Sequence, residues 1–452
     1  MSGAMTTSAA PAIFSGELGP DAAALALEAG AADEALAELP PVPDRSVAER
    51  RLASEILAEV RASRRAFLGL HADAVYDAIT DGRTRYVRLP ELVDKASERF
   101  PGLVPTGAQM KAERACIQAH KEGREIDQGI LCGALLGSPT AGRHLIDAML
   151  RPVARSLALL DEFGETGRAD LGSVLVERRG PAAHVTFHNG HCLNAESERL
   201  IADMETAIDL VLLDDQVRVG VLRGGEMDHP RYRGRRVFSA GINLKDLRDG
   251  RIPLVEFLLG RELGYINKML RGVLVDPAGT TNCTRTVQKP WIGAVESFAI
   301  GGGMQLLLVL DRVIAETGAY FSLPAADEGI VPGLGNLRLP RRTGARVARD
   351  VILGGRRIMA TDPEAALMCD EVVPPERMDE AIDRAVRELS VPAVAANRRM
   401  LAHGEEPVDV FREYLAEFAV VQVERAYSED VLAKVERRWQ ASESRRQAGK
   451  GT

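Results

Sequence analysis

The stretch "AIGGGMQLLL", residues 299–308, places three consecutive glycines directly before a strongly apolar run. The preceding "WIGAVES" predicts a strand, and the run after the glycines predicts a helix. The first turn of a helix leaves backbone N–H groups unpaired, and glycine lets a ligand approach them because it has no Cβ. The segment therefore predicts either close packing of a helix on a strand or a site where backbone amides bind a ligand.

A second segment, "FSAGINLKDL" at residues 238–247, also stands at a junction between a loop and a helix. Two such junctions in one chain favour the ligand-binding interpretation. The polar residue after the glycine run is an amide, Gln305, and an amide cannot shuttle protons as a carboxylate can.

Strands alternate with helices around both segments, from about residue 172 onward. Short strand-like runs occur in "SVLVERRGPAAHVTFHN" and "VRVGVLRG", and "AESERLIADMETAIDLVLLDD" fits a helix between them. Helical patterns also fit residues 254–274 and 407–427. This alternation predicts an α/β layer architecture.

Both ends of the chain are mostly helical in pattern. Residues 20–160 are almost wholly helical, and Asp44 or Ser46 could cap a long helix there; further helices fit residues 90–99, 107–122 and 140–165. We predict an N-terminal helical domain for packing or assembly (residues 1–170), a catalytic core (171–385), and C-terminal helices (386–452) that close a pocket or contact other subunits.

The composition narrows the function classes. The 452-residue chain is 46% hydrophobic and 27% charged, and its net charge of -8 argues against a broad nucleic-acid footprint. The start "MSGAMTTSAAPAIFSG" lacks a secretory signal, and no apolar run approaches the roughly 20 residues of a membrane helix. Five scattered cysteines without a CxxC pair indicate a reduced, cytoplasmic protein: Cys116, Cys132, Cys192, Cys283 and Cys369.

The segments "SAGINLKDL", "ESFAIGGGMQLLLVLDRVIAE" and "YFSLPAADEGIVPGLGNLRLPR" together resemble the crotonase superfamily of enoyl-CoA hydratases and isomerases. The resemblance implies a β-β-α spiral core, a homohexamer built as a dimer of trimers, and an oxyanion hole for an acyl-CoA thioester. In this chain its donors are the backbone amides of Ile242 and Gly302, each worth roughly 3–4 kcal/mol to a developing enolate oxygen. The adjoining backbone would line the acyl site: Ala240, Gly241, Ile300, Gly301 and Gly303.

Two positions depart from the hydratases of the superfamily. Where those enzymes carry a pair of glutamates, this chain has Gln305 and Ala325. An amide and a methyl group cannot carry out paired acid and base catalysis, so the chain does not look like a plain hydratase.

The helical N-terminal region, "HPRYRGRRVFSAGINLKDL", "RELGYINKMLRG" and "VPAVAANRRML" are similar to an oxygenase branch of the superfamily that uses neither metal nor organic cofactor. That similarity implies that a dihydroxyphenylacetyl-CoA enolate reacts with O2 to give dihydroxyphenylglyoxylate and free CoA, in the biosynthesis of dihydroxyphenylglycine for glycopeptide antibiotics. An O2-independent acyl-CoA hydrolase or isomerase is the alternative within the same fold.

The same similarity implies the side chains of the site. Glu196, Arg261 and Gln305 would position the ring, since arginine offers a rigid fork of donors while a carboxylate and an amide can accept from phenol O–H groups. Without the similarity, Glu196 and Arg261 would be assigned to a solvated helix surface. Phosphates or adenine of CoA would meet residues of the preceding loop and the following helix, which could equally be solvated: His229, Tyr232, Arg235, Arg236, Asn243 and Lys245.

Two other classes of function can be weighed from the sequence. An iron site could use two of His184, His188 and His191 with an acid, but this spacing in a β-run is more typical of surface histidines, so we predict no metal. An assembly or RNA-binding protein on the same scaffold is disfavoured by the negative charge and by the retained "AGIN" and "GGG" elements.

Overall fold

The computed structural model describes residues 14–275, 286–434 and 437. The predictions for most of the leading segment, for Cys283 and for the end of the chain lie outside these residues. The other four cysteines carry free thiols. In the described part of the chain, no helix has the length and apolar character needed to cross a membrane.

The N-terminal part is helical. Ser46 caps the longest helix through a capping box, because its side chain accepts from the Glu49 amide while the Glu49 carboxylate accepts from the Ser46 amide at 2.7 Å. The helices of this part are α1 (Leu18–Ala37), α2 (Val47–Ile79), α3 (Leu89–Arg99), α4 (Gly107–Arg114), α5 (Glu125–Gly137), α6 (Pro139–Leu150) and α7 (Ala154–Thr166).

The helices of this part differ from the sequence-based predictions in three ways. The helix predicted over 107–122 ends at Arg114, and the buried helix α5 lies within the region predicted to be almost wholly helical, although its own bounds were not predicted. Pro152 separates α6 from α7 within the helix predicted over 140–165, because proline removes a backbone donor and disfavours helical geometry in the residue before it.

A seven-stranded sheet forms the centre of the second part, in the order β1-β2-β3-β4-β7-β9-β12. β1, β2 and β3 pair antiparallel, and the strands from β3 to β12 run parallel. Their bounds are β1 (Arg168–Asp170), β2 (Val174–Arg179), β3 (Ala182–Phe187), β4 (Val219–Gly224), β7 (Trp291–Val295), β9 (Arg312–Glu316) and β12 (Glu371–Val373).

Helices cover both faces of this sheet. Helix α8 (Glu198–Leu213) packs on β2 and β3, whereas α14 (Met378–Leu389) packs on β4, β7 and β9. The adjacent residues Val221 and Leu222 of β4 belong to the two different cores that result. A parallel sheet buried on both faces explains why its strands are nearly continuous apolar runs.

Smaller elements lie beside the main sheet. β8 (Phe298–Ile300) and β11 (Ile358–Met359) flank β10 (Tyr320–Ser322), and β5 (Val273–Leu274) pairs with β6 (Thr286–Val287). The short helices are α9 (Leu244–Arg248), α10 (Asn267–Arg271), α11 (Gly302–Leu307) and α12 (Ala325–Glu328), and the longer α13 (Gly335–Ile352) follows. The helix predicted over 254–274 contains two π-helical runs, at Leu254–Leu259 and Glu262–Ile266.

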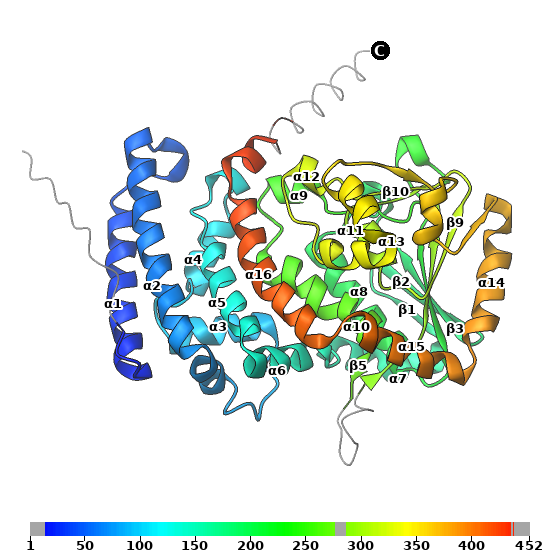
Figure 1. Cartoon of the computed structure of the whole chain (residues 1–452), viewed down its shortest axis with the longest axis horizontal. Coiled ribbons are helices and arrows are strands. Elements are labelled where there is room, and N and C mark those ends of the chain that lie inside the picture. Colours follow the sequence, from blue (N-terminus) through cyan, green and yellow to red (C-terminus); the bar gives the residue numbers. More distant parts are fainter. Residues whose placement is uncertain (1–13, 276–285, 435–436, 438–452) are drawn as a thin grey trace, which may run out of the picture.

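The C-terminal helices are α15 (Pro392–Glu405) and α16 (Val408–Ala426). Helix α16 lies between the N-terminal helices and the sheet (Figure 1) and packs closely on α5. A Cβ at Gly133 would come within 2.8 Å of the Ala416 carbonyl oxygen, so glycine permits this contact. The fold is thus an α/β core with helical regions at both ends, while the domain boundaries that we set at residues 170 and 385 remain predictions.

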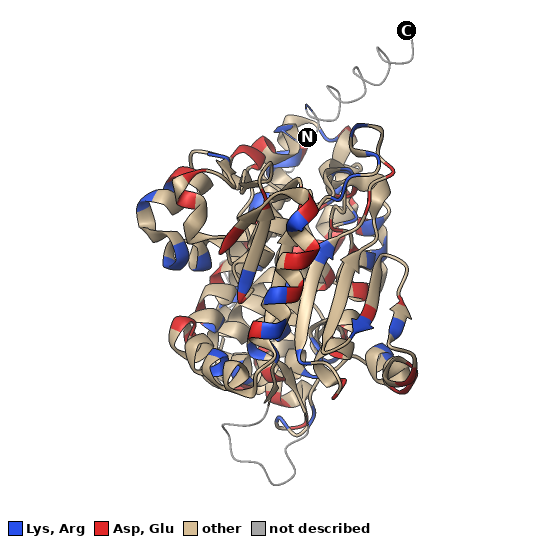
Figure 2. Cartoon of the chain, turned by 90° about the vertical axis from the view of Figure 1, so that its right-hand side faces the viewer, with Lys and Arg blue, Asp and Glu red and all other residues tan. Residues whose placement is uncertain are grey.

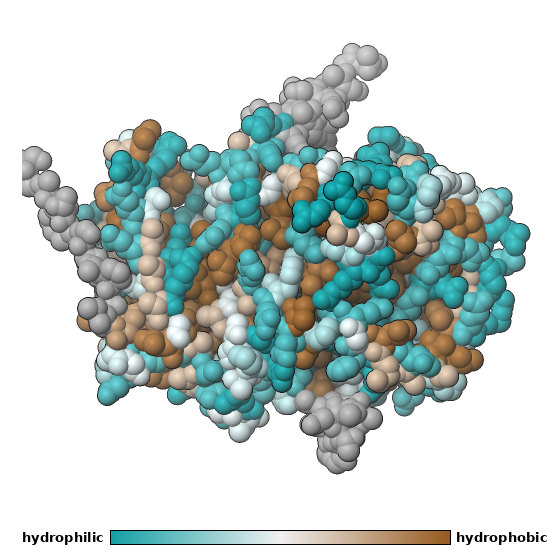
Figure 3. Space-filling model, in the orientation of Figure 1, coloured by the Kyte–Doolittle hydropathy of each residue, from teal (hydrophilic) through white to brown (hydrophobic). Residues whose placement is uncertain are grey.

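The surface is mixed in character. Basic and acidic residues are interspersed along the helices and loops in Figure 2 rather than separated by sign. Figure 3 shows hydrophobic side chains gathered between α2 and α16, where a groove is lined by Leu68, Ile130, Ala134 and Val420.

Candidate active site

Three backbone segments meet where the two glycine-bearing stretches were noted. Ser239 pairs with Ala299, and Glu196 pairs with Ile242. The Glu196 amide donates to the Gly241 carbonyl at 2.7 Å, and the Glu196 carbonyl accepts from the Asn243 amide at 3.0 Å. Residues that are far apart in the sequence are thereby held side by side.

Glycine is required at the contact between the two loops. Gly241 has φ +79°, and a Cβ there would lie 2.8 Å from the Ile300 oxygen and 3.2 Å from the Gly302 nitrogen. Gly301 has φ +54° and donates its own amide to the Ser322 carbonyl at 2.8 Å. Any side chain at Gly241 would separate the loops.

The two amides predicted as oxyanion donors lie at this junction. The structure gives neither the Ile242 amide nor the Gly302 amide an acceptor among the described residues. Gly302 is the first residue of α11, where helix amides lack intrahelical acceptors. Both groups are therefore available to an oxyanion of a ligand.

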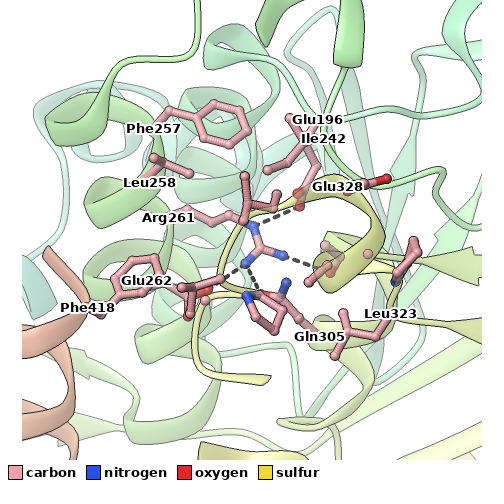
Figure 4. Close-up of a pocket in the computed structure, with 18 residues that line it drawn as sticks. Glu196, Ile242, Phe257, Leu258, Arg261, Glu262, Gln305, Leu323, Glu328 and Phe418 are labelled. Atoms are coloured by element: carbon pink, nitrogen blue, oxygen red, sulfur yellow. Dashed lines mark hydrogen bonds and ion pairs between the residues drawn. The ribbon is translucent and has the colours of Figure 1, made fainter. Parts of the chain in front are cut away.

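A pocket opens beside these amides, with about 480 Å³ of space when the open solvent at its mouth is included (Figure 4). Phe257 and Leu258 form one apolar wall of the pocket, and Phe418 of α16 forms part of another. The remaining lining comes from the loops and helices already described: Glu196, Ile242, Arg261, Glu262, Gly301, Gly302, Gln305, Leu323, Pro324, Ala325, Glu328, Ile330, Val331, Pro332 and Gly333.

Arg261 joins the polar side chains of the pocket into one network. Its Nε donates to Glu196 Oε1 at 3.0 Å, and its Nη1 donates to Glu262 Oε1 at 2.7 Å and to Gln305 Oε1 at 3.0 Å. Its Nη2 donates to the Gly302 carbonyl at 2.7 Å. The three side chains predicted to hold a ring therefore lie together. The Arg261 guanidinium donates most of its hydrogen bonds to groups of the protein rather than to a ligand.

This network decides which atoms of Gln305 and Glu196 remain for a ligand. The Gln305 oxygen accepts from Arg261, so its Nε2 group is the part left to meet a ligand, as a donor rather than the acceptor that we expected from the sequence. Glu196 Oε2 is buried and has no hydrogen-bond partner among the described residues. Glu196 thus presents a carboxylate oxygen as an acceptor and Gln305 an amide as a donor, while Glu262 Oε2 is likewise buried without a hydrogen-bond partner among the described residues, 3.6 Å from Arg338 Nη1.

Glu262 and Tyr265 belong to the same network and were not predicted. Tyr265 donates to Glu196 Oε1 at 2.9 Å, and Arg338 lies 3.6 Å from Glu262 Oε2. Burial raises the pKa of Glu262, although Arg261 and Arg338 oppose that rise. The sequence feature that could have pointed to these two residues is the polar segment "RELGY" within an otherwise apolar helical run.

Three of the six residues predicted to meet CoA lie on a separate surface beside the loops: His229, Tyr232 and Arg235. The Tyr232 ring packs edge-on against Phe298 at 5.5 Å, and Arg231 and Arg235 lie over its face at 5.4 and 6.0 Å. His229 lies 6.0 Å from the Tyr232 ring.

Tyr320 and Arg357 extend this surface, which we call the arginine–tyrosine patch: Arg231, Tyr232, Arg235, Tyr320 and Arg357. Tyr320 lies 5.4 Å from Phe298, and Arg357 lies 4.2 Å above the Tyr320 ring. Neither residue was predicted, because they stand far from the loop in the sequence.

The other predicted CoA residues have different surroundings. The Asn243 side chain caps α9 by accepting from the Lys245 and Asp246 amides, so a local structural role accounts for it. Arg236 donates to the Gly224 carbonyl at 3.0 Å, and Lys245 is exposed.

The histidines considered for iron do not converge. His184 lies on β3, and burial lowers its pKa to about 4; His188 lies beyond the end of that strand. Within the ranges that the structure describes, no group of three or more His, Cys, Asp or Glu side chains could hold a metal ion.

Paired glycine loops with free amides above a parallel core define the enoyl-CoA hydratase/isomerase superfamily, and residues 280–416 match its family model, Enoyl-CoA hydratase/isomerase. The chain is 58% identical over 417 residues to the (3,5-dihydroxyphenyl)acetyl-CoA 1,2-dioxygenase of Amycolatopsis orientalis, covering 92% of this chain and 95% of that relative. It therefore belongs to the family of that dioxygenase within the superfamily, as its motifs predicted.

More distant relatives cover only part of the chain. A probable enoyl-CoA hydratase of Rhizobium meliloti (strain 1021) is 30% identical over 225 residues, which are 49% of this chain and 77% of that protein. The crystal structure of an enoyl-CoA hydratase/isomerase from Pseudoalteromonas atlantica T6c is 20% identical, covers 60% of this chain and 97% of its own, and has a TM-score of 0.48.

Proposed function

We propose that this protein is a dioxygenase that converts (3,5-dihydroxyphenyl)acetyl-CoA and O2 to 3,5-dihydroxyphenylglyoxylate and free CoA, without a metal or an organic cofactor. The observation that carries the proposal is the pocket in which two free amides stand beside the Glu196–Arg261–Gln305 network. The name and the 58% identity of the Amycolatopsis relative supply the substrate.

The oxyanion amides account for the first step. A thioester oxygen that accepts from Ile242 and Gly302 gains roughly 3–4 kcal/mol per donor as it becomes an enolate oxygen after loss of the α-proton. The carbanion gives one electron to O2, and the resulting radical pair combines to a peroxide at the α-carbon.

The later steps conserve atoms and electrons. The peroxide oxygen attacks the thioester carbonyl and expels CoA as thiolate, closing a four-membered ring. Loss of the remaining α-hydrogen as a proton accompanies cleavage of the O–O bond, which leaves the ketone and the carboxylate of the glyoxylate. One oxygen atom enters each group.

The side chains present favour this course over hydration. At the two hydratase positions Gln305 carries an amide and Ala325, which lines the pocket, carries a methyl group. These two positions offer no carboxylate to deliver a proton or activate water, which favours reaction of the enolate with O2; the carboxylates that line the pocket stand elsewhere, at Glu196, Glu262 and Glu328.

The ring and CoA would occupy opposite sides of the amides. We propose that Glu196 Oε2 accepts from one ring hydroxyl and that the Gln305 amide donates to a ring oxygen. The arginine–tyrosine patch suits the phosphates and adenine of CoA, because arginine pairs with phosphate and aromatic rings stack on bases. We propose that the neighbouring residues His229 and Arg236 also contact CoA.

We also propose that the protein is cytoplasmic, that it assembles as a homohexamer, and that it acts in glycopeptide antibiotic biosynthesis. The exposed apolar side chains of α15, Met400 at 68% and Leu401 at 62%, support subunit contacts there.

The alternative function is an O2-independent thioester hydrolase or isomerase. Oxygen uptake and CoA release, measured together in the presence of a chelator, separate the two. We expect one O2 consumed per CoA released. Equal CoA release under strict anaerobiosis would favour the alternative.

A further inference from the structure

The Glu196 carboxylate is asymmetric. Oε1 accepts two hydrogen bonds, from Arg261 Nε at 3.0 Å and from the Tyr265 hydroxyl at 2.9 Å. Oε2 is buried without a hydrogen-bond partner among the described residues, and it faces Gly302, where a Cβ would come within 1.9 Å of it. A buried carboxylate oxygen left without a donor is costly unless a ligand supplies one.

The Tyr265 hydroxyl reaches Glu196 because the chain leaves regular helical geometry. Tyr265 lies in the π-helical run Glu262–Ile266, in which Gly264 has φ -88° and ψ -112°. A Cβ at Gly264 would lie 3.1 Å from the Glu205 carboxylate, so a close contact with α8 accompanies the kink. Single π turns inside helices occur frequently at functional sites.

Tyr265 remains a hydrogen-bond donor over the working pH range. It is 1% exposed, and burial raises its pKa well above the usual value, opposed by Arg261 and supported by the Glu196 carboxylate. Its ring lies 6.0 Å from the Arg261 guanidinium carbon. Two donors from one helical segment therefore hold the same oxygen of Glu196.

We propose that Tyr265 is a positioning residue that, with Arg261, fixes Oε1 of Glu196 so that Oε2 faces the pocket as the acceptor for a hydroxyl of the substrate ring. This inference rests on the proposed function for the identity of that ring. According to this inference, Tyr265 contributes to the preference of the enzyme for hydroxylated arylacetyl thioesters over unsubstituted ones.

The test compares two thioesters in wild type and Tyr265→Phe. Phenylalanine keeps the ring and removes only the hydroxyl. For (3,5-dihydroxyphenyl)acetyl-CoA we expect kcat/KM to fall about 10-fold, as when a charged hydrogen-bond partner is lost. For phenylacetyl-CoA, which has no ring hydroxyl, the change should stay within about 2-fold.

Tyr76→Phe is the matched control. Tyr76 is also fully buried and shares its hydroxyl with His144 Nδ1 at 2.8 Å, within the N-terminal helices. Its removal should leave the ratio of the two kcat/KM values unchanged. Affinity for free CoA, which lacks the dihydroxyphenyl ring, reports whether Tyr265→Phe remains folded.

Equilibrium binding separates this inference from the proposed function. Calorimetry with non-reactive thioether analogues, dihydroxylated and unsubstituted, measures the same selectivity without turnover. Loss of selectivity in Tyr265→Phe supports the positioning role even if the wild type consumes no O2. Unchanged selectivity, or an equal loss for both ligands, would overturn it.

Discussion

Arg261 Nε and Glu196 Oε1 lie 3.0 Å apart although the two residues are 65 positions apart in the chain. Both side chains are buried, and the same guanidinium also holds Gln305 and the Gly302 carbonyl. One arginine thus connects the side chains proposed to bind the ring to the helix that carries a proposed oxyanion donor. Substitutions in this network should disturb turnover more than CoA affinity.

Arg261→Lys tests the network directly. Lysine keeps the charge but lacks the planar fork that serves four acceptors, so we expect kcat/KM to fall about 100-fold. The affinity for free CoA should stay within about 2-fold of wild type. Arg143→Lys, at an exposed pair with Asp409, should be neutral. A larger loss of CoA affinity than of turnover would count against the assigned role of Arg261.

Gly302→Ala tests the approach of Glu196 to the amides. The new Cβ would lie 1.9 Å from Glu196 Oε2 and 3.0 Å from Arg261 Nη2, so the carboxylate must move. A displacement on the order of 1 Å costs about 100-fold in rate. Gly164→Ala, in an open stretch of α7, should instead raise the unfolding free energy by about 0.5–1 kcal/mol with unchanged turnover. Normal turnover in Gly302→Ala would be inconsistent with this geometry.

Ile242→Pro removes one of the two proposed oxyanion donors. Because this amide has no acceptor among the described residues, its loss breaks no internal hydrogen bond. We expect turnover to fall about 100- to 1,000-fold with a circular dichroism spectrum like that of wild type.

Leu244→Pro is the control for Ile242→Pro. Leu244 is the first residue of α9, a position that tolerates proline. If both variants lose the same activity, backbone distortion rather than the missing donor explains the result.

Gln305→Glu returns an acid to the hydratase position. A carboxylate there would compete with Glu262 for Arg261 and place negative charge beside the enolate, so oxygenation should fall about 10-fold or more. No hydration of an enoyl-CoA should appear, because Ala325 still lacks the second acid. Gln216→Glu, on the surface, is the matched control and should leave oxygenation unchanged. Unchanged oxygenation in Gln305→Glu would show that Gln305 has no role in the reaction.

The two glycine loops could be noted from local sequence, because glycine permits φ +79° at Gly241 and the contact between the loops, whereas the donors Ile242 and Gly302 were named from the family resemblance. The ring-positioning roles of Glu196, Arg261 and Gln305 were predicted from the family resemblance, since the local pattern of Glu196 and Arg261 does not distinguish them from a solvated helix surface, and that of Gln305 does not distinguish it from a core amide.

Other features depend on tertiary geometry that no local pattern reveals. Tyr265 reaches Glu196 only because a π-helical run changes which residues share a face, and helical periodicity assumes a regular turn. Likewise, Arg357, which directly precedes β11, meets Tyr320 of β10, and α16 meets α5 at Gly129 and Gly133.

Isotope labelling tests the central claim most directly. With ¹⁸O2 and (3,5-dihydroxyphenyl)acetyl-CoA, in chelator-treated enzyme, mass spectrometry of the promptly quenched glyoxylate should show two labelled oxygen atoms, one in the ketone and one in the carboxylate. A free acid formed without ¹⁸O, or with label only when the buffer is H2¹⁸O, would contradict the dioxygenase account and indicate hydrolysis.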